Sequence, residues 1–357
     1  MGHNVPLVVP PPKFDTTTRR PIMAHSRREF LKTIPSAVTF AAMPAGQLEA
    51  STTDAADTPD EIVGLFERLP GDKALKIFVP AAGGKPKIQV QLSSDRVLFV
   101  ASAMKTFALC ARLRQLDSPN VIAKLEDNDL ALNTSVWSLG SPTFNPPNLH
   151  GKVHERAAME AMITSSDNTA TDMIFKAAGV EKIRAFIRSA GLTRTRVPDS
   201  TRAFSGYVFG ADNYKTISWQ QLLSLVAGGV LVHPFLNDVQ TMASCPDDFV
   251  SYYSRALRGN FFQHRETLSE YRRILTLCDF IYLVPLPRGA SAYAKSGNVD
   301  FPGFHARSIA GGLFSSKRWI FFAFVINWYA ENGDDSKTVN QFFSAIHRSL
   351  TITMNST

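Results

Sequence analysis

A serine and a lysine lie three positions apart in the apolar run VASAMKTFAL, as Ser102 and Lys105. Lysine is rarely buried unless its charge is paired or used. If a helix begins near Ser102, the two side chains share a helix face, and the helix N-terminus favours negative charge on the hydroxyl oxygen. A desolvated lysine loses its proton easily, and the neutral amine can accept the serine proton. The spacing therefore fits a nucleophile and its base, but it also fits a capping serine followed by a lysine that reaches to the surface.

A second hydroxyl group occurs in Ser166-Asp167-Asn168, after the apolar segment AAMEAMIT. Ser, Asp and Asn favour turns and helix N-caps, so a purely structural role is one interpretation of this tripeptide. A hydroxyl and a carboxamide at such a turn could also pass a proton to a leaving group and hold a substrate amide.

A third motif, Lys295-Ser296-Gly297, follows the breaker-rich segment PLPRGASAY and precedes segments of strand character. It could be no more than the turn at the end of a strand. On an edge strand, however, the lysine and the hydroxyl would suit a substrate carboxylate. The glycine would let the substrate approach the backbone closely.

The three motifs, in this order, resemble the S-x-x-K, S-D-N and K-T-G signature of class A β-lactamases and penicillin-binding proteins, with Ser296 in place of the threonine. The resemblance runs from about residue 60 to 350. It implies a serine hydrolase that needs no metal or organic cofactor and acts on a small β-lactam or a cell-wall-peptide-like substrate. It also connects the chain with β-lactam catabolism and antibiotic resistance.

By this resemblance, Ser102 is the acylated nucleophile and Lys105 its proton acceptor or relay. Ser166 passes a proton to the departing nitrogen. Two backbone N–H groups, those of Ser102 and Asn298, form the oxyanion hole.

The same resemblance assigns the substrate-binding residues. Asn168 holds the substrate's amide side chain, and Lys295 and Ser296 attract its carboxylate. Gly297 gives the substrate access to the strand.

One catalytic group of class A β-lactamases is missing, namely the loop glutamate that activates the deacylating water. No glutamate occurs from Lys182 to Arg265, and Asp199 and Asp212 are the nearest carboxylates. The acylation machinery is therefore complete in sequence, and the deacylation machinery is not. A β-lactamase is the leading interpretation. A D-Ala-D-Ala peptidase or esterase, a β-lactam-binding protein that stays acylated, and a degenerate structural scaffold are the alternatives.

The periodicity predicts an α+β fold with strands at both ends and helices between them. A helix over 60–69 precedes a β-hairpin, and two strands and a helix over 338–349 close the chain. The middle helices are expected after Ser102 and over 153–164, 169–179, 217–231 and 266–278. We expect an antiparallel sheet lobe from 51–100 plus 285–357 and an inserted all-helical lobe over 101–284.

The sequence predicts an export signal in the N-terminal 50 residues. Arg27 and Arg28 are followed by Phe30, Leu31 and Lys32 and then by a weakly apolar segment, which resembles a twin-arginine signal. Cleavage near Ala50 is expected. The expected location is the periplasm, reached through the twin-arginine translocation machinery, and translation could begin at Met1 or Met23.

The composition also limits which classes of partner the protein could bind. The net charge is +7, but the basic residues are scattered and do not alternate with aromatics, which argues against nucleic-acid binding. No apolar run reaches the roughly 18 residues of a membrane span, so we expect no stable membrane anchor, and we expect a monomer. Three widely spaced cysteines, Cys110, Cys245 and Cys278, indicate core thiols or one optional bridge. The tripeptide HER at 154–156 lacks metal-ligand spacing.

Overall fold

The computed structural model describes residues 58–331, 333 and 335–357. The expected twin-arginine segment around Arg27 and Arg28, with its cleavage point near Ala50, lies outside these residues.

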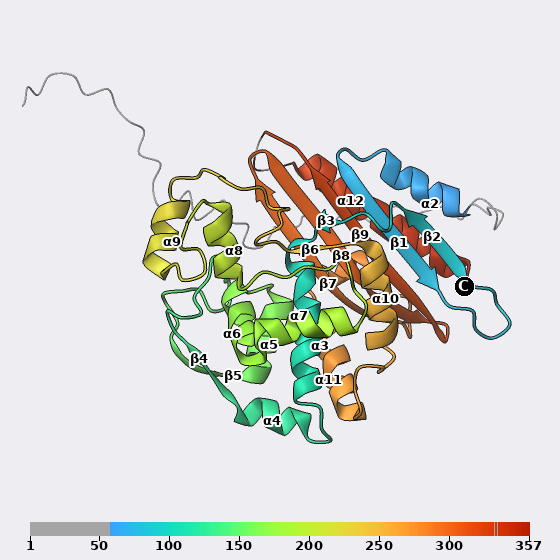
Figure 1. Ribbon diagram of the computed structural model, residues 1–357. Helices are drawn as coiled ribbons and strands as arrows, with labels where there is room; N and C mark the ends of the chain where they lie inside the picture. The colour runs from blue at the N-terminus through green and yellow to red at the C-terminus, as the bar shows by residue number, and fades with distance from the viewer. Residues whose placement is uncertain (1–57, 332, 334) are drawn as a thin grey trace, which may run out of the picture. The chain divides into compact units, whose positions relative to one another are not determined.

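A five-stranded antiparallel sheet forms the centre of the described chain, with strand order β2-β1-β9-β8-β7 (Figure 1). Its strands are β1 (Asp72–Val79), β2 (Ile88–Leu92), β7 (Ser291–Phe301), β8 (Phe304–Ser315) and β9 (Arg318–Trp328). Strands from both ends of the chain therefore meet in one sheet, as the sequence predicts. The turn between β8 and β9 is formed by Ser316 and Lys317, both with positive φ, as a tight two-residue hairpin requires.

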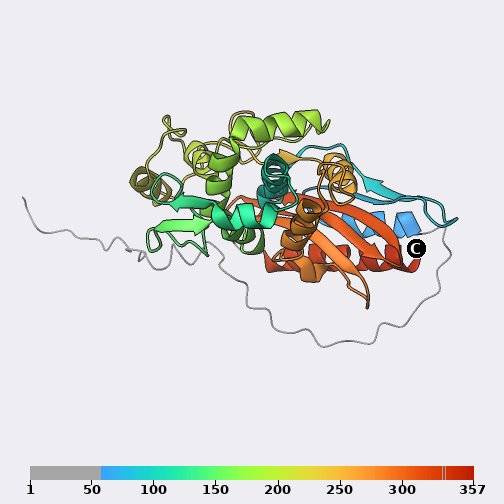
Figure 2. The ribbon, with the colours of Figure 1, turned by 90° about the horizontal axis from the view of Figure 1, so that it is seen from below.

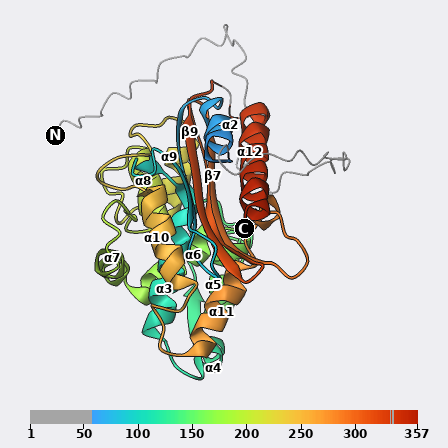
Figure 3. The same cartoon turned by 90° about the vertical axis from the view of Figure 1, so that its right-hand side faces the viewer.

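The strands have two different faces because successive side chains alternate. In β9, Ile320, Phe322, Phe324 and Ile326 belong to the core beneath α2 (Thr58–Glu67) and α12 (Ser336–Asn355). Phe321, Ala323 and Val325 belong to the other, larger core. Figure 3 shows α2 and α12 together on one side of the sheet and α10 (Pro246–Ala256) on the other.

The remaining helices come from the middle of the chain and lie on the α10 side of the sheet (Figure 2). They are α3 (Lys105–Gln115), α4 (Val121–Asp127), α5 (Glu155–Thr164), α6 (Asn168–Ala178), α7 (Val180–Ser189), α8 (Thr201–Val208), α9 (Trp219–Val226) and α11 (Arg265–Leu275), with a small ribbon of β4 (Asp129–Leu132) and β5 (Gly151–His154). Most side chains of α3 are buried, so this helix runs through the core. The predicted α+β class is confirmed.

One segment of the expected helical lobe packs on the sheet. The short strand β6 (Ala243–Ser244) pairs with β3 (Leu98–Phe99), and α10 packs against β1, β8 and β9. Lys76 of β1 and Asp247 of α10 form an ion pair at 2.6 Å. The division into two lobes at residues 100 and 285 stays a prediction. Besides β6 and α10, the turn η1 (Ala101–Met104), α11 and η2 (Ile281–Leu283) also contact strands of the sheet.

Strand β3 leads directly into the first motif and is fixed by a side chain of β9. The Asn327 carboxamide accepts a hydrogen bond from Phe99 N at 2.9 Å and donates one to Phe99 O at 2.9 Å. Both residues are buried. The Val100 N–H donates to Met242 O at 2.8 Å, so the chain enters the motif between two fixed neighbours.

No helix in the described part of the chain has both the length and the apolar character that spanning a bilayer requires.

We expect Asn327→Leu to lower the free energy of unfolding by about 2–6 kcal/mol, because it leaves two buried backbone groups of Phe99 without partners, at about 1–3 kcal/mol each. Urea unfolding followed by circular dichroism measures this change. Asn148→Leu, at an exposed position, is the control. Equal stability of the two variants would contradict the role given to Asn327.

Candidate active site

Ser102 lies in a short 3₁₀ turn, η1 (Ala101–Met104), directly before α3. The regular helix thus begins at Lys105, three residues later than the sequence suggests. Ala101 has φ 46, a conformation that costs a non-glycine residue about 1–3 kcal/mol and is retained where the surroundings enforce it. Ser102 itself is partly exposed.

Gly297 explains why η1 has this position. A Cβ atom on Gly297 would lie 2.2 Å from Val100 O, 2.8 Å from Ser102 N and 2.8 Å from Ala103 N, so no side chain fits there. From the neighbouring strand β8, Ser308 Oγ donates to Val100 O at 2.7 Å. The third motif is therefore packed directly against the backbone of the first.

The Lys105 side chain is fully buried, as its proposed use requires. Its Nζ donates to Ser166 O at 2.5 Å and to Asn168 Oδ1 at 2.7 Å, and it lies 3.3 Å from Ser166 Oγ. Among the described residues, no hydrogen bond joins Lys105 to Ser102. A neutral amine has two N–H groups, which the two carbonyl oxygens would satisfy, and one lone pair, which is then free for a hydroxyl proton.

The protonation of Lys105 is set by its surroundings. Burial, followed by the positive charge of Lys295, lowers the pKa of Lys105 to about 7. The carboxylates of Asp167, Asp172 and Asp279 oppose this shift. Near neutral pH a large share of Lys105 is therefore uncharged and able to accept a proton.

The second motif presents its atoms to Lys105 through an unusual backbone conformation. Ser166 has φ 55, and its carbonyl accepts the Lys105 hydrogen bond. Asp167 caps α6 by accepting from Ala170 N at 2.7 Å, and it also accepts from Thr143 N and Phe144 N. These bonds hold the turn in place.

Asn168 has less freedom than its predicted role assumes. Its Oδ1 accepts from Lys105, and its Nδ2 donates to Leu139 O at 2.7 Å. In this structure the carboxamide therefore orients Lys105, and only one of its N–H donors is left for a substrate amide.

The third motif contains a residue that sequence reasoning missed. Ser296 Oγ donates to Asp279 Oδ1 at 2.5 Å, and the fully buried Lys295 has its Nζ 3.5 Å from the same oxygen. Asp279 is the only acidic residue between Glu270 and Asp300, which was the available signal. Nothing in the sequence, however, places it beside Ser296.

The edge of β7 carries the predicted oxyanion donor. The Ser296 backbone N–H faces the Cys278 thiol. Burial raises the pKa of this thiol to about 11. Backbone N–H groups two residues apart in an antiparallel strand point to the same edge, so the Asn298 N–H points to the open edge as well. Ser102 N lies next to Gly297, which precedes Asn298. The two donors named from sequence are thus on neighbouring segments.

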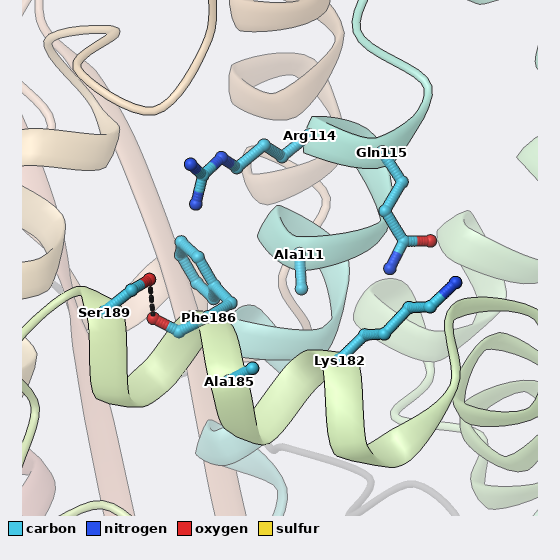
Figure 4. A pocket seen from close by; sticks show the side chains of 7 residues that line it. All are labelled: Ala111, Arg114, Gln115, Lys182, Ala185, Phe186 and Ser189. Atoms are coloured by element: carbon cyan, nitrogen blue, oxygen red, sulfur yellow. Dashed lines mark hydrogen bonds between the residues drawn. The ribbon is translucent and has the colours of Figure 1, made fainter.

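A separate hollow of about 410 Å³ lies between α3 and α7, where Arg114 lies over the Phe186 ring and Lys182 extends toward Gln115 (Figure 4). None of the motif residues lines it. Within the described part of the chain, no three His, Cys, Asp or Glu side chains converge as a metal site would require. The three cysteines, all described, are buried and free.

Comparison with protein families gives a match to the β-lactamase enzyme family over residues 72–349. The chain belongs to the β-lactamase enzyme family. It is therefore a hydrolase of the serine β-lactamase type, and the match favours this prediction over the peptidase, esterase and binding-protein alternatives. A comparison with curated protein sequences found no match.

Solved β-lactamase structures share the fold. A class A β-lactamase from Mycobacterium abscessus is 17% identical, with TM-score 0.60, over 84% of this chain and 98% of its own. The extended-spectrum β-lactamase TLA-3 is 14% identical, with TM-score 0.61, over 83% and 98%. A mutant of PBP-A, in an acyl-enzyme complex with penicillin G, is 16% identical, with TM-score 0.61, over 84% and 97%.

In this β-lactamase-family chain, the two carboxylates suggested for deacylation lie in different settings. Asp199 is occupied on both oxygens, by Arg184 at 2.7 Å and by Gln240 at 2.8 Å. Asp212 is exposed in the turn after α8. The carboxylate buried between α6 and α8 is Asp172, which accepts from Thr201 N at 2.6 Å.

Burial raises the pKa of Asp172 to about 6, against the lowering effect of its hydrogen bonds to Thr201. With its oxygens held by the start of α8, it acts as a structural cap. Asp172 thus stabilises the start of α8 through hydrogen bonds from the backbone N–H groups of Thr201 and Arg202.

We expect acylation of Ser102 by a chromogenic cephalosporin to rise with pH, with a midpoint near 7, since only neutral Lys105 accepts a proton and its pKa is lowered to about 7. Below that pH the amine is protonated and inactive. Lys105→Ala should lower the rate by about 10²–10⁴ and abolish this pH step. Stopped-flow absorbance measures both.

Lys176→Ala, which removes an exposed lysine of α6, should leave the rate and the profile unchanged. A pH step that persists in Lys105→Ala would assign the titration to another group.

Proposed function

We propose that this enzyme opens β-lactam rings by forming an acyl-enzyme on Ser102. The observation that carries the proposal is a buried amine, Lys105, whose pKa is near 7 and which lies one helical turn from Ser102 and 3.3 Å from the Ser166 hydroxyl. A buried lysine tuned to neutrality is costly for the fold and useful as a general base.

The acylation step is derived from these positions. Lys105 takes the proton of Ser102 Oγ as this oxygen attacks the lactam carbonyl carbon. The N–H groups of Ser102 and Asn298 stabilise the oxyanion. When the oxyanion collapses, the C–N bond breaks and Ser166 Oγ gives its proton to the nitrogen. Lys105 then returns the proton to Ser166, so that the amine is neutral again.

Deacylation is the step for which we assign no well-placed general base. The ester on Ser102 hydrolyses only if a base takes a proton from an attacking water. Asp199 is held by Arg184 and Gln240, and Asp212 is exposed in the turn after α8, which leaves Lys105 as the base we propose. Losing a placed general base costs about 10²–10⁴ in rate. We therefore propose slow turnover after fast acylation. A mutant of PBP-A, which has a similar fold, is described in an acyl-enzyme complex with penicillin G, and this supports an adduct of this kind.

We expect a burst of one β-lactam opened per chain, followed by slow steady turnover, when the protein is mixed with a chromogenic cephalosporin. Mass spectrometry within seconds should show a chain heavier by one ring-opened antibiotic, with the adduct on Ser102. Ser102→Ala should abolish the adduct, since no other nucleophile is assigned.

The control is Ser165→Ala, which removes the hydroxyl next to the proposed proton donor Ser166 in the chain. Ser165 Oγ is hydrogen-bonded to the Thr143 hydroxyl and not to Lys105. The Ser165→Ala variant should therefore form the β-lactam adduct like the parent protein. An adduct that persists in Ser102→Ala would remove Ser102 from the mechanism. Fast turnover without any adduct would show that an efficient base is present.

We also propose that residues 1–50 direct export through the twin-arginine machinery to the periplasm, where the mature enzyme acts as a monomer. The arginine pair followed by Phe30, Leu31 and Lys32 supports this assignment.

Replacing Arg27 and Arg28 with lysine should retain the precursor in the cytoplasm, because the signal depends on the two guanidinium groups. Fractionation and immunoblotting of the parent and variant chains measure the change. Arg19 and Arg20, changed to lysine in a control chain, lie upstream of Met23 and should have no effect. Equal periplasmic yields of the two chains would refute the signal.

A further inference from the structure

Asp279 places a carboxylate of the protein at the residues expected to bind a substrate carboxylate. Its Oδ1 accepts from Ser296 Oγ at 2.5 Å and lies 3.5 Å from Lys295 Nζ. The same oxygen accepts from Phe280 N at 3.1 Å, and the Cys278 thiol lies 3.5 Å away. Several donors thus converge on one carboxylate oxygen.

The segment that carries Asp279 is anchored on both sides. Cys278, Leu283 and Val284 are buried in the core beneath α12. The Phe280 ring packs on Phe343 of α12, with ring centroids 5.5 Å apart. The Asp279 side chain is 27% exposed. Its position beside Ser296 is therefore fixed by packing on either side of it, and the carboxylate is still reached from the solvent side.

The charges of this region are already matched. Burial alone would raise the pKa of Asp279, but the Lys295 charge and the Ser296 hydrogen bond outweigh it and hold the pKa below its usual range. Asp279 is thus ionised at neutral pH and neutralises Lys295. A substrate carboxylate would meet a second anion at the same lysine, and like charges placed together are strongly unfavourable.

The hydrogen-bond capacity favours a different ligand. The Ser296 hydroxyl has one proton, which it donates to Asp279, so it can only accept from a substrate. Lys295 Nζ is buried and has no hydrogen-bond partner among the residues that the structure describes. The Lys295 N–H groups that do not face Asp279 thus make no hydrogen bond among these residues, and a neutral carbonyl oxygen placed against them would add no negative charge beside Asp279.

We propose that Asp279 is a specificity-determining residue that makes the Lys295–Ser296 subsite select substrates with an uncharged carbonyl group, such as an ester or amide, over substrates with a free carboxylate. This inference rests on the proposed function for the assignment of the subsite. It does not depend on the acylation step.

A binding experiment in the Ser102→Ala background separates affinity from chemistry. The probes are a chromogenic cephalosporin and the methyl ester of its carboxylate, with dissociation constants measured by isothermal titration calorimetry. The protein with Asp279 intact should bind the ester at least as tightly as the acid. Asp279→Asn should tighten binding of the acid by about tenfold or more and change that of the ester by less than about threefold.

Two further variants control for charge and for folding. Asp247→Asn removes a carboxylate that pairs with Lys76, so it changes the net charge by the same amount away from the subsite, and it should leave both constants unchanged. Asp279→Glu keeps the negative charge and should keep the preference for the ester. If Asp279→Asn does not fold, the test is the relative affinity of the protein with Asp279 intact for the ester and the acid. Tenfold tighter binding of the acid than of the ester, with Asp279 intact, overturns the inference.

The outcomes for this inference and for the proposed function are distinct. An adduct on Ser102 together with unchanged ligand preference in Asp279→Asn leaves the acyl-enzyme function intact and rejects the role of Asp279. A shift of preference without any adduct on Ser102 supports Asp279 and rejects the function.

Discussion

Two lysine side chains, Lys105 and Lys295, are fully buried in one site, and the local structure is organised around their charges. Two ammonium groups near each other in a low-dielectric interior are unfavourable. The structure lowers this cost in a different way for each lysine. Lys105 loses its charge, because burial and the Lys295 charge lower its pKa to about 7. Lys295 stays beside the ionised Asp279. A neutral amine such as Lys105 can accept a proton, whereas the Lys295 amine lies in an ion pair with Asp279.

The scaffold keeps these groups in place with backbone conformations that are costly on their own. Ala101 and Ser166 both have positive φ, and each lies beside a functional atom. The first is fixed because Gly297 brings β7 onto η1 and because Asn327 holds the preceding Phe99. The second is fixed by Asp167, which caps α6 and ties down the neighbouring loop. Strain at the site is therefore offset by hydrogen bonds and packing from the surrounding elements.

The sequence predicted the parts of this site that local patterns encode. The three motifs, the hairpin of β1 and β2 and the helix α12 can be inferred from spacing and periodicity, because neighbouring residues determine them. Asp279 could not be inferred in this way, since its contact with Ser296 depends on how the segment between α11 and β7 folds back along a strand edge. The bond from Asn168 to Leu139 O depends in the same way on a loop contact. The helix α10 was not among the expected helices, so its packing on the sheet could not be predicted either.

In the proposed mechanism, the same burial that would let Lys105 act as a base for acylation restricts its use in hydrolysis of the ester. In that mechanism, Lys105 passes the proton taken from Ser102 to Ser166, which has protonated the leaving nitrogen, and Lys105 is then neutral beside the ester. Its hydrogen bonds go to Ser166 O and Asn168 Oδ1, both rigidly held, so the amine cannot move far toward an attacking water without leaving two buried acceptors unpaired. Asp172 is close enough to raise the pKa of Lys105, but the Asp172 oxygens accept hydrogen bonds from the backbone N–H groups at the start of α8. The carboxylates around this site thus cap helices or balance lysine charge, which is the physical basis of the proposed slow hydrolysis of the ester.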